Sequence, residues 1–261
     1  GGIVAHQRHS PPRLDGRAQQ VGVVDPAVGL EGIDRIDALP TAIGQQVVQW
    51  LDILDQGIKR RGAQSALERF GPEAALLAGD WLISRSIELI SHYRQPAIAA
   101  FSAACMDMSE GELMDLSSAS TSDDYYQCIS KKTATLFSAS AKIGAMLSGA
   151  DDCEVAILES YGKSLGLGYQ VLDDLEEFLG LDQGKSSQKT SVTLPCIYGG
   201  LHQRDAAAHM CIRVIEEHSR SAKDALRHSS GEGLMLRRLE SIVDEMTSRG
   251  LKRCRSQRSL C

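Results

Sequence analysis

The sequence predicts an all-α fold, built as a single-domain helical bundle, and three observations favour this class. Of the 261 residues, 43% are hydrophobic and 5% are aromatic, and the apolar content comes mainly from Ala, Leu, Ile and Met, which favour helices over sheet. Apolar positions recur at three- and four-residue intervals in five stretches, namely 74–93, 132–149, 154–178, 206–217 and 233–247. Turn-forming residues separate these stretches, so we expect helices joined by short loops.

The two ends of the chain differ from its middle. Residues 1–40 hold four of the seven prolines and show no sustained period, so we expect an irregular or weakly structured segment there, followed by a helical domain over residues 41–261. The last twelve residues, GLKRCRSQRSLC, are basic and poor in apolar side chains, which predicts a frayed, solvated tail. The alternative is that their cations fold over a phosphate-binding mouth.

Composition argues against several function classes. The net charge of −6 gives no long-range attraction for nucleic acid. No stretch approaches the roughly 18 to 20 uninterrupted apolar residues that a membrane span needs, so we expect no stable membrane insertion. The seven cysteines are odd in number and form no CxxC pair, which favours reduced thiols and a cytoplasmic location.

The most informative segment is GLGYQVLDDLEEFLG, which begins at Gly166. On a helix, Asp173 and Glu177 are four residues apart and share a face, with Asp174 on its shoulder. Three carboxylates on one patch repel one another unless a cation lies among them. Magnesium (Mg2+) suits such a patch because it prefers oxygen ligands and typically combines one or two carboxylates with substrate phosphates. The alternative is a solvated acidic face.

The surroundings of this cluster favour the first interpretation. Gln170 precedes the carboxylates, and Lys185 and Lys189 follow them, ahead of a Thr-Leu-Pro sequence. These motifs resemble, in type and order, those of the polyprenyl synthetase family, the trans-isoprenyl diphosphate synthases. Glu177 stands where the family more often has aspartate. The short connection that contains the two lysines is similar to that of archaeal-type, short-chain farnesyl or geranylgeranyl diphosphate synthases.

Three upstream segments extend the resemblance. KKTATLFSASAKIGAMLSGA, which contains Lys132 and Thr133, is similar to the family's Lys-Thr-Ala helix. MSEGELMDL resembles the family's Gly-Glu segment, and LLAGDWLISRS resembles its Gly-Asp-Tyr-Leu-Leu helix, with Trp81 in the aromatic place. We expect packing roles for these last two segments. Several ordered motifs together are a strong signal, although each alone is weak.

A first aspartate-rich cluster is present in altered form. WLDILDQGIKRRG keeps Asp52 and Asp55 and the pair Arg60-Arg61, but Leu51 replaces the family's leading aspartate. The loss of one carboxylate should weaken magnesium binding. The two arginines could still grip a phosphate, because guanidinium groups pair with it bidentately.

The resemblance implies a bundle of the isoprenoid synthase type and an active site made from both clusters. Isopentenyl diphosphate and an allylic diphosphate would be the substrates, with Mg2+ as the cofactor. The expected roles are magnesium ligation by Asp52, Asp55, Asp173, Asp174 and Glu177, phosphate binding by Arg60, Arg61, Lys132, Lys185 and Lys189, and substrate orientation by Thr133 and Gln170. Catalysis would rest on Asp52, Asp55, Asp173, Asp174 and Lys132.

Three functions remain open at this point. The first is an active prenyltransferase that makes a short-chain isoprenyl diphosphate. The second, which Leu51 favours, is an impaired or regulatory subunit of a heteromeric synthase. The third is a terpene cyclase-like enzyme that keeps the metal cluster without condensing two substrates. By resemblance we expect a homodimer, with a heterodimer as the alternative.

Overall fold

The structure is a computed structural model that describes residues 59–60, 63–93, 95–116, 121–181, 192–199, 204–231 and 233–258. Its helices are α2 (Ala66–Phe70), α3 (Pro72–Ile90), α4 (Gln95–Leu116), α5 (Ser122–Ile129), the π-helical turn η1 (Ser130–Ala134), α6 (Thr135–Ser148), α7 (Asp152–Phe178), α8 (Leu194–Gly199), α9 (Arg204–Leu226) and α10 (Gly233–Arg258). Two strands of two residues each, β1 (Lys59–Arg60) and β2 (Ala63–Gln64), pair antiparallel. The prediction of an all-α fold is confirmed.

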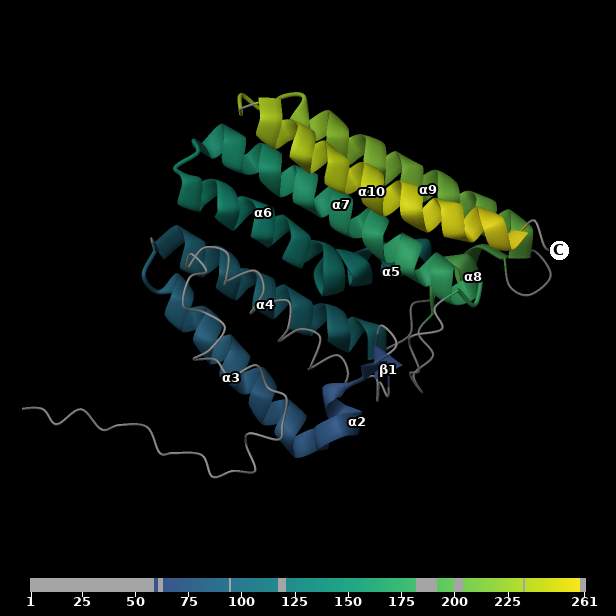
Figure 1. The fold of residues 1–261 in the computed structure, drawn as a ribbon, viewed down its shortest axis with the longest axis horizontal. Helices are drawn as coiled ribbons and strands as arrows, with labels where there is room; N and C mark the ends of the chain where they lie inside the picture. The colour runs from purple at the N-terminus through teal and green to yellow at the C-terminus, as the bar shows by residue number, and fades with distance from the viewer. Residues whose placement is uncertain are drawn as a thin grey trace, which may run out of the picture.

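The long helices lie side by side, with α7 at the centre (Figure 1). Helix α7 packs against α6 on one side and against α9 on the other, and α10 covers both α7 and α9. Helix α4 packs against α6, and α3 contacts α4 at the edge of the bundle. None of the helices in the described ranges combines the length and the apolar composition that a membrane span requires.

The largest part of the core surrounds the C-terminal half of α7. Val171 and Leu175 are fully buried there and pack with Ile215 of α9 and Cys254 of α10. Since burying a large aliphatic side chain stabilises a fold by about 1.5–3 kcal/mol, this layer fixes the position of α7 firmly. The carboxylates of α7 alternate with these anchors in sequence, since Asp173 and Asp174 lie between Val171 and Leu175, so the core determines where they point.

Local sequence signals explain where several helices begin. Thr121 caps α5 through a capping box with Asp124, in which each side chain accepts a hydrogen bond from the other residue's backbone N–H. Asp151 caps α7, and its Oδ1 accepts from the backbone N–H of Glu154 at 2.8 Å. The turn-forming pairs Gly71-Pro72 and Asp151-Asp152 lie at the starts of α3 and α7.

The structure corrects the expectation of a frayed C-terminal tail over residues 250–261. Helix α10 continues to Arg258, and Gly250, Leu251 and Cys254 are buried on its inner face. Their three- and four-residue spacing continues the pattern of buried Val243. The neighbouring basic residues are exposed, so this is an amphipathic helix whose charged face dominates the composition. Residues 259–261 lie outside the described part.

Candidate active site

Asp174 is a buried carboxylate of α7 at the centre of a polar network. Only 6% of its surface is exposed. Its Oδ2 accepts a hydrogen bond from the hydroxyl of Tyr125 at 2.6 Å, and its Oδ1 accepts one from Nε2 of Gln170 at 2.8 Å. A buried carboxylate requires such donors because it has lost its hydration. The network therefore joins α5 to α7.

The same network reaches η1 through Gln170. The hydroxyl of Thr133 donates to Oε1 of Gln170 at 2.7 Å. With its amide oxygen facing Thr133 and its amide nitrogen facing Asp174, Gln170 has one orientation that satisfies both neighbours. The structure thus brings together three residues that the sequence predicts for the site, from segments far apart in the chain.

The electrostatics of Asp174 follow from its burial. Desolvation raises the pKa of its carboxyl from 3.8 to about 7, against the lowering effect of the hydrogen bonds from Tyr125 and Gln170. The nearby charges of Asp173 and Glu177 raise this pKa as well. Burial, followed by the charge of Asp174, raises the pKa of Tyr125 well above 10. The phenol therefore keeps its proton and remains a donor to the carboxylate.

The other two carboxylates of α7 lie nearer the surface. Asp173 is half-buried and Glu177 is exposed, while Asp174 points inward. This division agrees with the predicted helical face, on which Asp173 and Glu177 are one turn apart. Within the described ranges, no three His, Cys, Asp or Glu side chains converge closely enough to hold a metal ion by themselves. Asp173 and Glu177 offer the oxygen ligands that Mg2+ prefers, and further ligands would have to come from elsewhere.

Lys132 lies in an acidic cradle made by α4. Its Nζ donates to Oδ2 of Asp115 at 2.9 Å and lies 3.1 Å from Oε2 of Glu112. The three side chains are between 10% and 17% exposed, so solvent screens this group of charges less than it screens a surface pair. Two carboxylates against one ammonium leave a net negative charge, and the cradle fixes the direction of the lysine.

Sequence reasoning assigned the α4 segment a packing role and missed this cradle. Glu112 and Asp115 are three residues apart in MSEGELMDL, and this spacing places two acids on one helical face. The signal was present, but nothing local to it indicates a lysine 17 residues further along. Trp81, also assigned to packing, is 46% exposed on α3.

A close approach of two backbones positions Lys132. Gly111 of α4 contacts η1, and a Cβ atom at position 111 would lie 2.3 Å from the backbone nitrogen of Lys132. No side chain fits at that distance, so the α4–η1 contact requires glycine. The wider π-helical turn of residues 130–134 presents Lys132 to α4 and Thr133 to α7.

Several predicted site residues lie outside the part of the chain that the structure describes. They are Asp52, Asp55, Arg61, Lys185 and Lys189. The backbone of Arg60 belongs to β1, but its side chain is not described. The predicted meeting of the two aspartate-rich clusters therefore stays a prediction.

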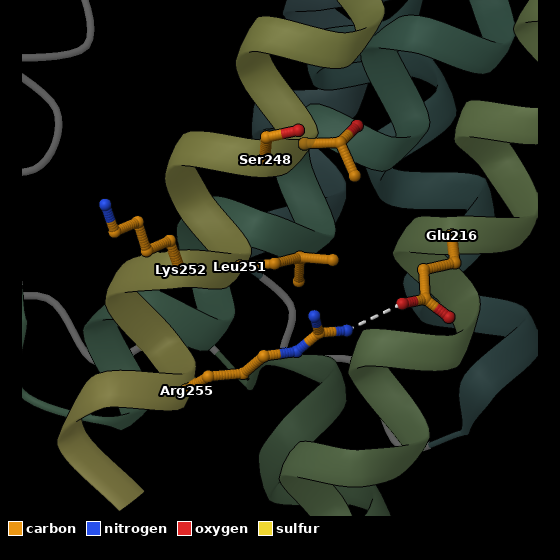
Figure 2. Close-up of a pocket in the computed structure, with 6 residues that line it drawn as sticks. Glu216, Ser248, Leu251, Lys252 and Arg255 are labelled. Carbon is orange, nitrogen blue, oxygen red and sulfur yellow. Dashed lines mark hydrogen bonds and ion pairs between the residues drawn. The ribbon is translucent and has the colours of Figure 1, made fainter.

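A separate surface cavity of about 450 Å³ lies between α9 and α10 (Figure 2). It is lined by Glu216, Thr247, Ser248, Leu251, Lys252 and Arg255. Arg255 spans it and donates to Glu216 at 2.9 Å, as the dashed line in Figure 2 indicates. None of the predicted site residues lines this cavity, so we do not assign the chemistry to it.

The chain is similar to several known prenyl diphosphate synthases. A geranylfarnesyl diphosphate synthase of Methanosarcina mazei is 45% identical over 178 residues, which are 67% of this chain and 60% of the relative. A geranylgeranyl diphosphate synthase of the same organism is 32% identical over 177 residues, 60% of this chain and 55% of the relative. The crystal structure of a geranyltranstransferase from Methanosarcina mazei matches with a TM-score of 0.70 and 37% identity, covering 83% of this chain and 76% of that chain.

The bundle and its central acidic helix define an isoprenyl synthase fold. The family model for polyprenyl synthetase matches residues 50–229, more than half of the chain. The chain belongs to the polyprenyl synthetase family. It spans 60% and 55% of the lengths of the two curated relatives above.

Proposed function

We propose that this protein is a prenyltransferase that condenses isopentenyl diphosphate with an allylic diphosphate to form a short-chain isoprenyl diphosphate. The observation that carries the proposal is the hydrogen bond of 2.7 Å between Thr133 and Gln170. It joins the Lys-Thr segment of η1 to the carboxylate motif of α7. Membership of the polyprenyl synthetase family supports the same reaction class.

The proposed roles follow from exposure and charge. Asp173 and Glu177, with Asp52 and Asp55 from the first cluster, are proposed as Mg2+ ligands. The sequence predicts Asp174 as a further ligand, but its burial and its two hydrogen bonds within the protein favour support from behind the site. When bound, Mg2+ would supply positive charge that stabilises the departing diphosphate.

The basic residues are proposed to bind the diphosphate groups. Lys132, held by Asp115 and Glu112, would direct its ammonium toward the allylic diphosphate. Arg60, Arg61, Lys185 and Lys189 complete the proposed set on the basis of sequence alone. A fixed ammonium stabilises developing charge without a reorganisation cost at the moment of reaction.

In the proposed reaction the carbon–oxygen bond of the allylic diphosphate breaks, and diphosphate leaves with the electron pair. The double bond of isopentenyl diphosphate attacks the resulting allylic carbocation and forms a new carbon–carbon bond. A proton then leaves the adjacent carbon and is accepted by the released diphosphate, so atoms and charges balance. Gln170 and Thr133 would hold the allylic substrate in the required orientation.

Exposed apolar side chains on α3 support the proposed homodimer. Leu76, Leu77, Trp81 and Ile87 are each between 46% and 66% exposed. A cluster of this kind at the edge of a bundle is typical of a protein–protein contact. A cytoplasmic location remains a prediction from the sequence.

The direct test is incubation with labelled isopentenyl diphosphate, an allylic primer and Mg2+, followed by analysis of chain length. We expect a labelled short-chain product that requires the metal and is lost in Asp173→Asn. Absence of any elongated product at all metal concentrations would contradict the proposal. A labelled hydrocarbon from the primer alone would instead identify a cyclase.

A further inference from the structure

Tyr125 combines a core position with one specific polar contact. Tyr125 is 3% exposed, and its ring packs in the central core, edge-to-face with Tyr126. Its hydroxyl donates to Oδ2 of Asp174, which lies 49 positions further along the chain. A phenylalanine ring would fill the same space in the core, so packing alone does not explain why a hydroxyl is present.

We propose that Tyr125 is a positioning residue of the active site. It acts through Asp174 to hold Gln170, and through Gln170 to hold Thr133, in the orientation that binds the allylic diphosphate. This inference rests on the function proposed above and adds to it a residue that makes no contact with substrate.

The direction of each hydrogen bond supports the coupling. Tyr125 has one hydroxyl proton and donates it to Asp174. The second carboxylate oxygen accepts from Nε2 of Gln170, and this turns Oε1 of Gln170 toward Thr133. Each hydrogen bond in this series determines whether the next residue faces it with a donor or with an acceptor atom. A change at Tyr125 therefore reaches Thr133 through two intermediates.

Removal of the phenol oxygen would break the series of hydrogen bonds at its most buried member, the bond from Tyr125 to Asp174. In Tyr125→Phe the ring still fills the core, but Oδ2 of Asp174 loses its donor at a site that water scarcely reaches. The carboxylate must then rotate or take up a proton. Rotation would move Oδ1 away from Nε2 of Gln170, and protonation would weaken that hydrogen bond by removing the charge of its acceptor. In either case Gln170 is held less firmly in its present orientation.

Tyr161 provides a matched control on α7. It is also 3% exposed, and its hydroxyl donates to the backbone oxygen of Leu239 at 3.0 Å. Tyr161→Phe therefore removes a buried tyrosine hydrogen bond that has no part in the Asp174 network. A loss of general packing or stability should affect both variants alike.

The experiment compares both variants in steady-state kinetics. We expect Tyr125→Phe to lower kcat/KM for the allylic diphosphate about tenfold, with KM for isopentenyl diphosphate unchanged. Tyr161→Phe should stay within about twofold of the wild type for both substrates. Equal kinetics for the two variants, with an active wild type, would overturn the positioning role alone. An inactive wild type would contradict the proposed function itself.

A double-mutant cycle tests whether the effect passes through Asp174. In an Asp174→Asn background, Tyr125→Phe should add less than about a twofold further loss, because the charged acceptor is already gone. A further loss as large as in the wild-type background would overturn the proposal. If Tyr125→Phe fails to fold, the double mutant, which has no unpaired buried charge, supplies the comparison with Asp174→Asn alone.

Discussion

Lys132 of η1 is held 2.9 Å from Asp115 of α4, a residue that the sequence did not suggest for the site. The contact ties the orientation of a proposed substrate-binding ammonium to the packing of two helices. Glu112, 3.1 Å away on the same face of α4, shares the ammonium. Residues behind the site therefore support it from two helices, namely Glu112 and Asp115 on α4 and Tyr125 on α5.

Asp115→Asn should weaken binding of the allylic diphosphate, because we expect the lost orientation of Lys132 to outweigh the removal of one negative charge from the cradle. Glu112 still pairs with Lys132, so the stability cost should be about 1–3 kcal/mol, the range for a lost hydrogen bond between charged groups away from solvent. The ammonium would no longer be fixed from two sides, and we expect kcat/KM for the allylic substrate to fall about tenfold. Steady-state kinetics with isopentenyl diphosphate saturating measures this change.

Glu110→Gln is the matched control for this prediction. Glu110 pairs with Lys131, the neighbour of Lys132, and its side chain is 60% exposed. Loss of a pair so exposed should leave stability and kinetics nearly unchanged. If Asp115→Asn behaves like Glu110→Gln, the cradle does not orient the lysine.

Gly111→Ala should destabilise the protein and disturb Lys132. The added Cβ would meet the Lys132 backbone at 2.3 Å, so α4 and η1 must separate. We expect a loss of about 1–3 kcal/mol in the free energy of unfolding, measured by urea titration. Gly144→Ala on α6 is the control, because a Cβ there meets nothing within 4 Å. Gly144→Ala should stabilise the helix by about 0.5–1 kcal/mol. A similar gain in stability for Gly111→Ala would contradict the close contact between the backbones of Gly111 and Lys132.

The buried Asp174 should make the metal-free protein less stable as pH rises. Burial raises its pKa from 3.8 to about 7, so the folded chain holds this proton more tightly than the unfolded chain. The resulting stability is fully present below the unfolded pKa and is lost as pH rises through the folded pKa. Between pH ~5.5 and ~8 the loss from this group is about 2 kcal/mol. Asp174→Asn should remove that part of the pH dependence in denaturant unfolding with a chelator present, and parallel pH profiles would contradict the burial of a titrating acid.

Charge on α3 should dissociate the proposed dimer. Leu77 and Trp81 are one helical turn apart and are 66% and 46% exposed. Replacing both by Glu places like charges across a two-fold interface, which should yield monomers in light scattering after size-exclusion chromatography. Leu234→Glu on α10, at a residue 55% exposed, should leave the dimer intact. A wild-type monomer, or a double variant that stays dimeric, would exclude this interface.

The long helices whose buried face is clearly more apolar than their exposed face could be predicted from the sequence. Helices without this difference could not. The predicted stretches correspond to α3, α6, α7, α9 and α10. Helix α4 lay outside them because its buried stripe contains small residues, such as Ala97 and Ala104, which contrast weakly with exposed Ala and Ser. Hydropathy periodicity is weak when the packed face is made of alanine.

The candidate site was predictable where its residues are close in sequence. Asp173 and Glu177 share a local helical spacing, and the family resemblance supplied Lys132 and Thr133. The partners Tyr125 and Asp115 come from other helices, and no local spacing relates them to the acids and the lysine that they support. Such contacts depend on helix packing, which periodicity alone does not determine.

The central claim is that Asp173 and Glu177 share divalent ions with Asp52 and Asp55 around a bound diphosphate. The most direct measurement is a crystal soaked with Mn2+, which has an anomalous signal, and a non-reactive allylic diphosphate analogue. We predict anomalous peaks at about 2.1–2.3 Å from carboxylate oxygens of both clusters, with the diphosphate between them. Peaks absent from Asp173 and Glu177, or the two clusters on separate outer surfaces, would contradict the account.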